Sequence, residues 1–359
     1  MYCKNCNSSN IFKKKFNFDF YSHRDFSKII SSNTYLECRD CKIIYSMKTL
    51  FLKRLYKKIF AKKKLVTKSK DIELIPKFND VNIYQHFFNK EIKNKNNLRI
   101  LDYGNSSINQ LKDYSNFFYN TKIFFYDIAI SKDYLFYNKK TNTKCIITSN
   151  LKKIDQKIDI MISFNSLQYY LNYKSFFKFI KRKSYLKTKM YITTPSIDIN
   201  KYFFLLGDEY LKFSKIGLIN FLEKNLNKET KLLKRNYLST VNFALVNFNK
   251  NKKLRKAKKV NKLDAIHKYL NQKSLQIKNL NLKKTFIFGT RVNSYFIAKY
   301  LSNFGGLIDD QINKTVKKYR LLDKIYDKDI LIMIPYMGIK YNMIKKILIK
   351  KKFKNFFQI

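Results

Sequence analysis

Four of the chain's five cysteines stand in two C-x-x-C pairs, Cys3–Cys6 and Cys38–Cys41. A C-x-x-C turn brings two thiolates to one ion, and two such turns supply the four sulfur ligands that tetrahedral zinc prefers. The gap between the pairs is long enough for a hairpin, and FNFDFY and TYLECRDCKIIYS are typical of strands. Disulfides are the alternative, but they need an oxidising compartment, and we see no apolar leader before the first pair. We therefore predict a structural zinc module over residues 1–46 and a cytoplasmic location.

The chain is strongly basic, with 75 Lys and Arg residues against 25 Asp and Glu residues and a net charge of +50. Such a charge attracts polyanions. However, Lys, Asn, Ile, Phe and Tyr are all abundant while Gly (7), Pro (3) and Trp (0) are scarce, a composition typical of AT-rich codons. The lysines are also spread along the chain, so we give the charge little weight as a sign of RNA or DNA binding. No uncharged apolar run of about 18 residues exists, so no membrane span is expected.

Beyond the cysteine pairs, the chain divides into four segments. Residues 47–97 form a basic connector with apolar residues at helical spacing, typical of a connecting helix, although a membrane-surface helix is an alternative. Residues 98–248 alternate strands and helices, which predicts a parallel, doubly wound sheet. Residues 249–283 form a charged linker or exposed helix, and residues 284–359 repeat the strand–helix pattern as a smaller α/β domain. The clearest strands of the larger domain are LRILDYG, KIFFYDIAI, IDIMISFN and KMYITTP.

The first of these strands ends in a turn suited to a nucleotide-like ligand. Asp102 and Gly104 close the strand, and Asn105 and Ser106 follow it before a predicted helix. Such a turn presents backbone N–H groups and a helix N-terminus to a ligand. Asp127 ends the next strand, 23 residues after Gly104, about where an acceptor for a ribose diol belongs. A solvated strand-end aspartate is the alternative for Asp127.

The order of these segments resembles the sugar C-methyltransferases, which join a four-cysteine zinc module, a class I S-adenosylmethionine (SAM)-dependent methyltransferase core and a C-terminal α/β domain. The resemblance implies an α/β fold with a Rossmann-like core, and C-methylation of a nucleotide-linked keto-deoxysugar through an enolate. It also implies that SAM is held at the turn described above. The segments that resemble the family are LDYGNSSINQL, FFYDIA, KIDIMISFNSLQYYLNYKSFFKFI, YITTPSID, GDEYLKFSKIGLINFLEK, FIFGTRVNS, LIDDQINKTVKKY and DILIMIPYM.

The resemblance also places the catalytic tract. Asp208, Glu209 and Tyr210 occupy the positions of the family's His-Glu-His core, so a tyrosine stands where the family has its proposed catalytic histidine. Carbon methylation beside a ketone needs a base and a donor for the enolate oxygen, and Tyr210 and Glu209 are the candidate bases. His86 lies where the family closes over its cofactor. The alternatives are a helix-start role for Asp208 and Glu209 and a packed core role for His86.

Two other functions stay open. RNA methyltransferases also join a zinc module to a methyltransferase core, and the positive charge suits RNA, but the sequence lacks an Asn-Pro-Pro-Tyr motif. A non-catalytic relative would keep the fold without the chemistry. The missing histidine favours that hypothesis, as does Ile108 at the place of a loop glycine. We expect a nucleotide sugar as the partner, with RNA as the weaker alternative.

Overall fold

The computed structural model describes residues 1–359 except 23–25, 63–86, 88, 93–95, 105–114, 129, 131, 234–240, 252–260, 281, 310–319 and 337. The chain forms two compact units, each built from several stretches of sequence. The first unit comprises Met1–Lys13, Tyr35–Asn200 and Glu209–Val260. The second comprises Lys14–Thr34, Lys201–Asp208 and Asn261–Ile359.

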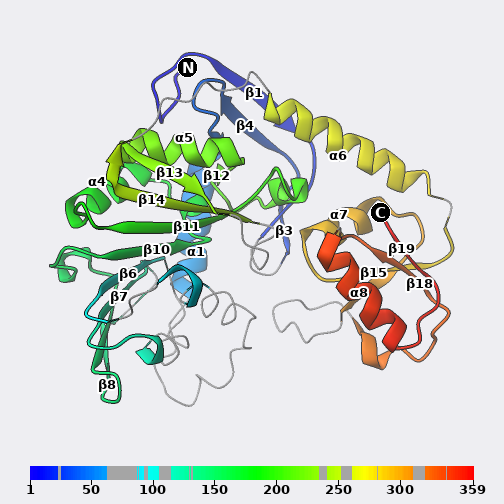
Figure 1. Ribbon diagram of the computed structural model, residues 1–359. Coiled ribbons are helices and arrows are strands. Elements are labelled where there is room, and N and C mark those ends of the chain that lie inside the picture. Colours follow the sequence, from blue (N-terminus) through cyan, green and yellow to red (C-terminus); the bar gives the residue numbers. More distant parts are fainter. Residues whose placement is uncertain are drawn as a thin grey trace. The chain divides into compact units, whose positions relative to one another are not determined.

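An eight-stranded sheet forms the centre of the first unit, in the order β13-β14-β11-β10-β6-β7-β9-β8. Strands β6, β7, β9, β10 and β11 run parallel, whereas β8 and β14 run antiparallel to their neighbours. Numbered along the chain, the five parallel strands lie in the order 3-2-1-4-5, as in a doubly wound sheet. The predicted Rossmann-like core is therefore confirmed (Figure 1). The strands are β6 (Arg99–Tyr103), β7 (Lys122–Tyr126), β8 (Tyr134–Asn138), β9 (Thr143–Thr148), β10 (Ile160–Phe164), β11 (Lys189–Pro195), β13 (Lys228–Leu232) and β14 (Val241–Asn251).

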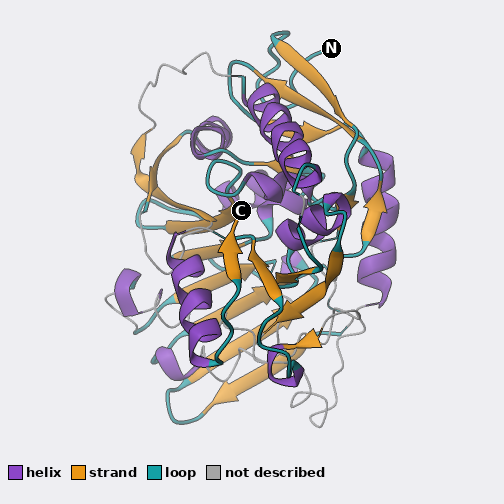
Figure 2. Cartoon of the chain, turned by 90° about the vertical axis from the view of Figure 1, so that its right-hand side faces the viewer, coloured by secondary structure: helices purple, strands orange, loops and turns teal. Residues whose placement is uncertain are grey.

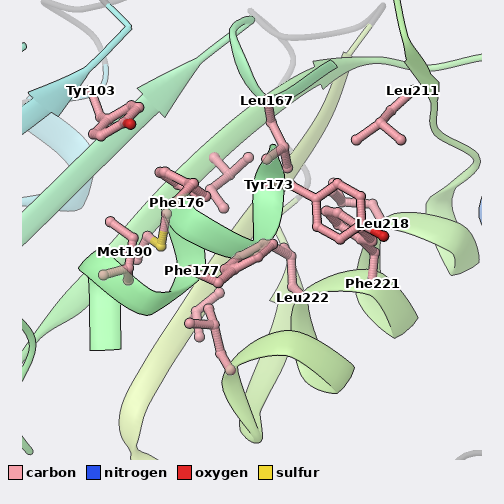
Figure 3. Close-up of a cluster of buried hydrophobic side chains, with 14 of the residues drawn as sticks. Tyr103, Leu167, Tyr173, Phe176, Phe177, Met190, Leu211, Leu218, Phe221 and Leu222 are labelled. Atoms are coloured by element: carbon pink, nitrogen blue, oxygen red, sulfur yellow. The ribbon is translucent and has the colours of Figure 1, made fainter. Parts of the chain in front are cut away.

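The central strands are buried on both faces, which explains their nearly continuous apolar runs. Along β6, Ile100 packs in one core with Ile123, while Leu101 packs in the opposite core with Met161. The second of these cores lies under α4 (Tyr173–Lys183) and α5 (Lys215–Leu226). Figure 3 shows the aromatic centre of this core, where the rings of Phe177 and Phe221 lie 5.4 Å apart.

A smaller sheet carries the cysteine pairs, in the order β1-β4-β5-β12. Its last strand comes from the predicted catalytic tract, because Leu211 pairs antiparallel with Tyr45. Helix α1 (Thr49–Lys62) follows this sheet and buries Leu52 and Tyr56 in the core beneath α4 and α5. The strands are β1 (Ile11–Phe16), β4 (Asn33–Cys38), β5 (Ile44–Ser46) and β12 (Leu211–Lys212).

The second unit holds a five-stranded parallel sheet in the order β17-β16-β15-β18-β19. Numbered along the chain, these strands also lie in the order 3-2-1-4-5, so the predicted smaller α/β domain is confirmed. In Figure 2 the C-terminus marks the end of β19. The strands are β15 (Thr285–Phe288), β16 (Phe304–Asp309), β17 (Arg320–Leu321), β18 (Leu331–Ile334) and β19 (Phe356–Gln358).

Helices and a short hairpin complete the second unit. Asp19, directly before β2, lies 2.9 Å from the ammonium groups of both Lys28 and Lys299, so it joins the hairpin to α7. The elements are α6 (Lys262–Lys278), α7 (Val292–Tyr300), α8 (Gly338–Lys350), β2 (Phe20–Tyr21) and β3 (Lys28–Ile30). The 3-10 helices of the whole chain are η3 (Leu151–Lys153), η4 (Leu167–Tyr169), η5 (Lys201–Leu205) and η7 (Leu322–Lys324). Among the described residues, no helix has the length and apolar character needed to cross a membrane.

Candidate metal centre and ligand site

The four N-terminal cysteines converge on one point. The sulfur atoms of Cys3 and Cys41 lie 3.6 Å apart, and those of Cys6 and Cys38 lie 3.5 Å apart. All four sulfurs lie within 4.8 Å of one another, and none forms a disulfide. A zinc ion with Zn–S bonds of about 2.3 Å places its four ligands about 3.8 Å apart. The predicted convergence is confirmed and its size fits zinc, while zinc binding itself stays a prediction.

The two C-x-x-C turns have the same backbone geometry. The N–H of Asn7 donates to the carbonyl of Cys3 at 2.9 Å, and the N–H of Lys42 donates to the carbonyl of Cys38 at 2.8 Å. Asn7 and Lys42 both adopt the left-handed conformation, with φ of 59° and 60°. The N–H of Cys41 also points at the sulfur of Cys38, at 3.5 Å. Both turns thus present their thiolates in the same way to a shared ion, and backbone donors favour the charged sulfur.

The predicted ligand turn lies at the carboxyl edge of the large sheet. Gly104 follows β6 and Asp127 follows β7, and these neighbouring parallel strands pair Tyr103 with Tyr126. The N–H of Gly104 donates to the carbonyl of Tyr126 at 2.7 Å. The two predicted residues therefore lie at the same end of adjacent strands, where open α/β sheets bind ligands. Asp127 is 7% exposed.

Of the other predicted cofactor residues, only Asp102 lies within the described part of the chain. Asp102 is buried within β6, two residues before the glycine of the turn. Asn105 and Ser106 lie outside the described residues, and so does the predicted catalytic residue His86.

Three hydroxyl groups that the sequence analysis missed surround Gly104. Ser166 and Tyr170 follow β10, and Ser166 donates to the carbonyl of Tyr103 at 3.1 Å. The Tyr170 hydroxyl shares its proton between the Ser166 Oγ, at 2.9 Å, and the same carbonyl, at 3.3 Å. The hydroxyl of Ser163 lies 2.8 Å from that of Ser166. Gly104 has φ of 90°, and a methyl group there would lie 2.5 Å from the Ser166 Cβ and 2.8 Å from the Tyr170 hydroxyl. Only glycine fits this position, both for its backbone conformation and for the space.

The predicted catalytic tract is buried and held from two sides. Glu209 and Lys212 form an ion pair of 2.6 Å, with side chains 2% and 0% exposed. The N–H of Tyr210 donates to the carbonyl of Gln168 in η4, at 2.9 Å. The carbonyl of Tyr210 accepts the N–H of Ser46 in β5, at 2.9 Å. The tract therefore joins the loop after β10 to the sheet that carries the cysteines.

The tyrosine of this tract lacks the property that a base needs. Tyr210 is 2% exposed, and its ring lies 6.3 Å from the ring of Tyr45. Burial raises the pKa of Tyr210 to about 12, whereas a base role requires a pKa well below 10. Tyr210 thus keeps its proton at neutral pH.

The fifth cysteine, Cys145, is fully buried in β9, and burial raises its pKa to about 12.

The second unit has a glycine turn between its first parallel strand and a helix. Gly289 follows β15 with φ of 92° and precedes α7. Thr290 donates to the carboxylate of Asp309, at the end of the adjacent β16, at 3.0 Å. Asn293 in α7 donates to the carbonyl of Pro335, beyond β18, at 2.9 Å. The described turn therefore uses its polar groups to join three neighbouring strand ends.

Comparisons with known proteins give only distant likenesses to solved structures. No family model matches the sequence, and no curated protein matches it. Among solved structures, the mitomycin 7-O-methyltransferase MmcR is 10% identical over 42% of this chain and 48% of its own, with a TM-score of 0.32. The plantazolicin methyltransferase BpumL in complex with SAH is 11% identical over 55% and 98%, with a TM-score of 0.34. The CurJ carbon methyltransferase is 10% identical over 46% and 51%, with a TM-score of 0.32. The matched region thus spans about half of the MmcR chain, and the Rossmann-like assignment rests on the sheet order itself.

Proposed function

We propose that this chain is a SAM-dependent methyltransferase whose cofactor site lies at the carboxyl ends of β6 and β7. The observation that carries the proposal is the pair Gly104 and Asp127, on adjacent strand ends of a 3-2-1-4-5 parallel sheet. The carboxylate of Asp127 would accept hydrogen bonds from a ribose diol, and Gly104 would let a ligand approach the backbone closely. SAM, when bound, would supply an electrophilic methyl group.

We propose a nucleotide-linked keto-deoxysugar as the methyl acceptor, on the strength of the family resemblance of the segments. Methylation of a carbon beside a ketone requires loss of a proton from that carbon and stabilisation of the enolate oxygen. Glu209 is the candidate base, because Lys212 lies 2.6 Å away and favours its ionised form. Tyr210 keeps its proton, which makes it a candidate donor to the enolate oxygen rather than the base.

We also propose that the four cysteines hold a structural zinc ion. Four thiolates fill a tetrahedral shell, so the ion would have no open position for catalysis. The sheet that carries these cysteines also contains β12, and its β5 bonds the backbone of Tyr210 through Ser46. Zinc would therefore support the position of the catalytic tract through the fold.

Methyl transfer from labelled SAM tests the proposed function. The full-length protein is incubated with SAM and a nucleotide-linked 4-keto-6-deoxysugar, and the products are analysed by mass spectrometry and NMR. We expect one new methyl group bound to a sugar carbon, and much slower transfer by the Asp127→Ala variant when SAM is below saturation. Transfer to RNA instead, falling steeply with salt, would support the second candidate function, which the net charge of +50 favours. Bound SAM without transfer to either acceptor would support a non-catalytic relative.

A further inference from the structure

The peptide between Tyr103 and Gly104 is held from both neighbouring strands. Its N–H, from Gly104, donates to the carbonyl of Tyr126 on the β7 side. Its carbonyl, from Tyr103, accepts the hydroxyls of Ser166 and Tyr170 on the β10 side. The backbone of β7 and these two side chains therefore together fix the orientation of the turn at the proposed cofactor site.

Tyr170 is suited to this task by its surroundings. Its ring packs against Tyr103 at 5.4 Å and against Phe176 at 4.9 Å, which fixes the direction of the hydroxyl. Burial raises the pKa of Tyr170 above its usual range, so the hydroxyl stays protonated and acts as a donor. The residue as a whole is nevertheless only partly buried.

The order of the strands indicates which part of a ligand would reach this position. Strands β7, β6 and β10 are consecutive in the sheet, and adjacent strands lie about 4.8 Å apart. A nucleoside with its ribose at Asp127 would therefore extend about 10 Å across the end of β6 before it reaches β10. In SAM, the group attached to the nucleoside is a sulfonium with an amino-acid arm, which ends in an ammonium and a carboxylate.

We propose that Tyr170 and Ser166 are positioning residues that select the amino-acid arm of SAM, because they hold the peptide at the end of β6, the strand between Asp127 and β10. This inference rests on the proposed cofactor site and names residues that the site's own motif does not include. It implies that loss of either hydroxyl weakens the binding of ligands that carry the arm and leaves the binding of ligands without the arm unchanged.

Calorimetric titration of two ligands tests the inference. SAM and 5′-methylthioadenosine share the adenosine and the sulfur, but only SAM has the amino-acid arm. Each is titrated into the full-length protein and into Tyr170→Phe and Ser166→Ala. Tyr170→Phe keeps the ring that packs on Tyr103, and Tyr169→Phe, whose ring packs on Tyr56, serves as the matched control.

We expect SAM to bind Tyr170→Phe about five- to tenfold more weakly than the parent, the scale of one lost hydrogen bond. Methylthioadenosine should bind the parent and both variants within about twofold, and Tyr169→Phe should match the parent for both ligands. Equal losses for both ligands, or unchanged SAM affinity in both variants, would overturn the inference while leaving the cofactor site intact. A parent protein that binds neither ligand would refute the cofactor site, and the inference with it.

Discussion

The buried pair of Glu209 and Lys212 gives the sharpest prediction about stability. The Lys212→Met variant keeps an apolar stem of the same length but removes the ammonium 2.6 Å from the Glu209 carboxylate. Since that carboxylate is 2% exposed, water cannot replace the lost partner. Breaking a buried ion pair from one side costs about 3–5 kcal/mol, and we expect Lys212→Met to lower the free energy of unfolding by that amount.

A double-mutant cycle separates the pair from other effects of the substitutions. Glu209→Gln alone leaves the ammonium without its carboxylate, whereas Glu209→Gln with Lys212→Met removes both charges. The double variant should lose at least about 2 kcal/mol less free energy of unfolding than the two single variants together, because residues in direct contact are coupled. Free energies of unfolding come from urea titrations followed by circular dichroism.

The matched control is Lys231→Met. Lys231 lies 3.9 Å from Glu229 but is 53% exposed, so its loss should cost less than about 1 kcal/mol. If Lys212→Met is as mild as Lys231→Met, or if the two changes at the buried pair are additive, the reasoning from burial is refuted.

Three further predictions concern the metal, the glycine turn and pH. Metal analysis should find about one zinc per chain, bound by the four N-terminal cysteines, and a chelator should lower the melting temperature; a metal-free protein with unchanged melting would contradict this. Gly104→Ala should lower the free energy of unfolding by at least about 2 kcal/mol, from backbone strain and contact with Ser166, and a neutral result in urea titration would disprove the crowding. Lys299 and Lys28 oppose the desolvation of Asp19 and hold its pKa below the ordinary value of 3.8. The stability from this depressed pKa is therefore present above pH 3.8 and lost as pH falls through the lower folded-state value. Asp19→Asn should be less stable than the parent at pH 7, and this difference in stability should shrink as the pH falls below 3.8. A difference in melting temperature that does not change with pH would contradict this prediction.

The sequence predicts those strands whose signal is local. β6, β7, β10 and β11 are buried on both faces, so each leaves an apolar run that is readable without its neighbours. β12 has only two residues and exists because Leu211 pairs with Tyr45, from a distant segment. Such a strand has no signal of its own, since its partner decides it.

Within the candidate site too, some residues can be predicted from the sequence and others cannot. Gly104 and Asp127 are predictable because a glycine and an acid at strand ends are local features. The role of Tyr170 depends on β10 lying next to β6, which no pattern around Tyr170 reveals. The sequence names Tyr210 as a candidate base, but burial sets its pKa, and burial is a property of the folded chain.

Calorimetric titration of SAM into the full-length protein tests the cofactor site most directly. We predict one SAM bound per chain, in agreement with a single glycine–acid pair at the edge of the large sheet. Asp127→Ala should weaken binding by about 1.5–3 kcal/mol, the contribution of a hydrogen bond to a charged group. Absence of SAM binding, or an affinity that Asp127→Ala leaves unchanged, would contradict the proposed site.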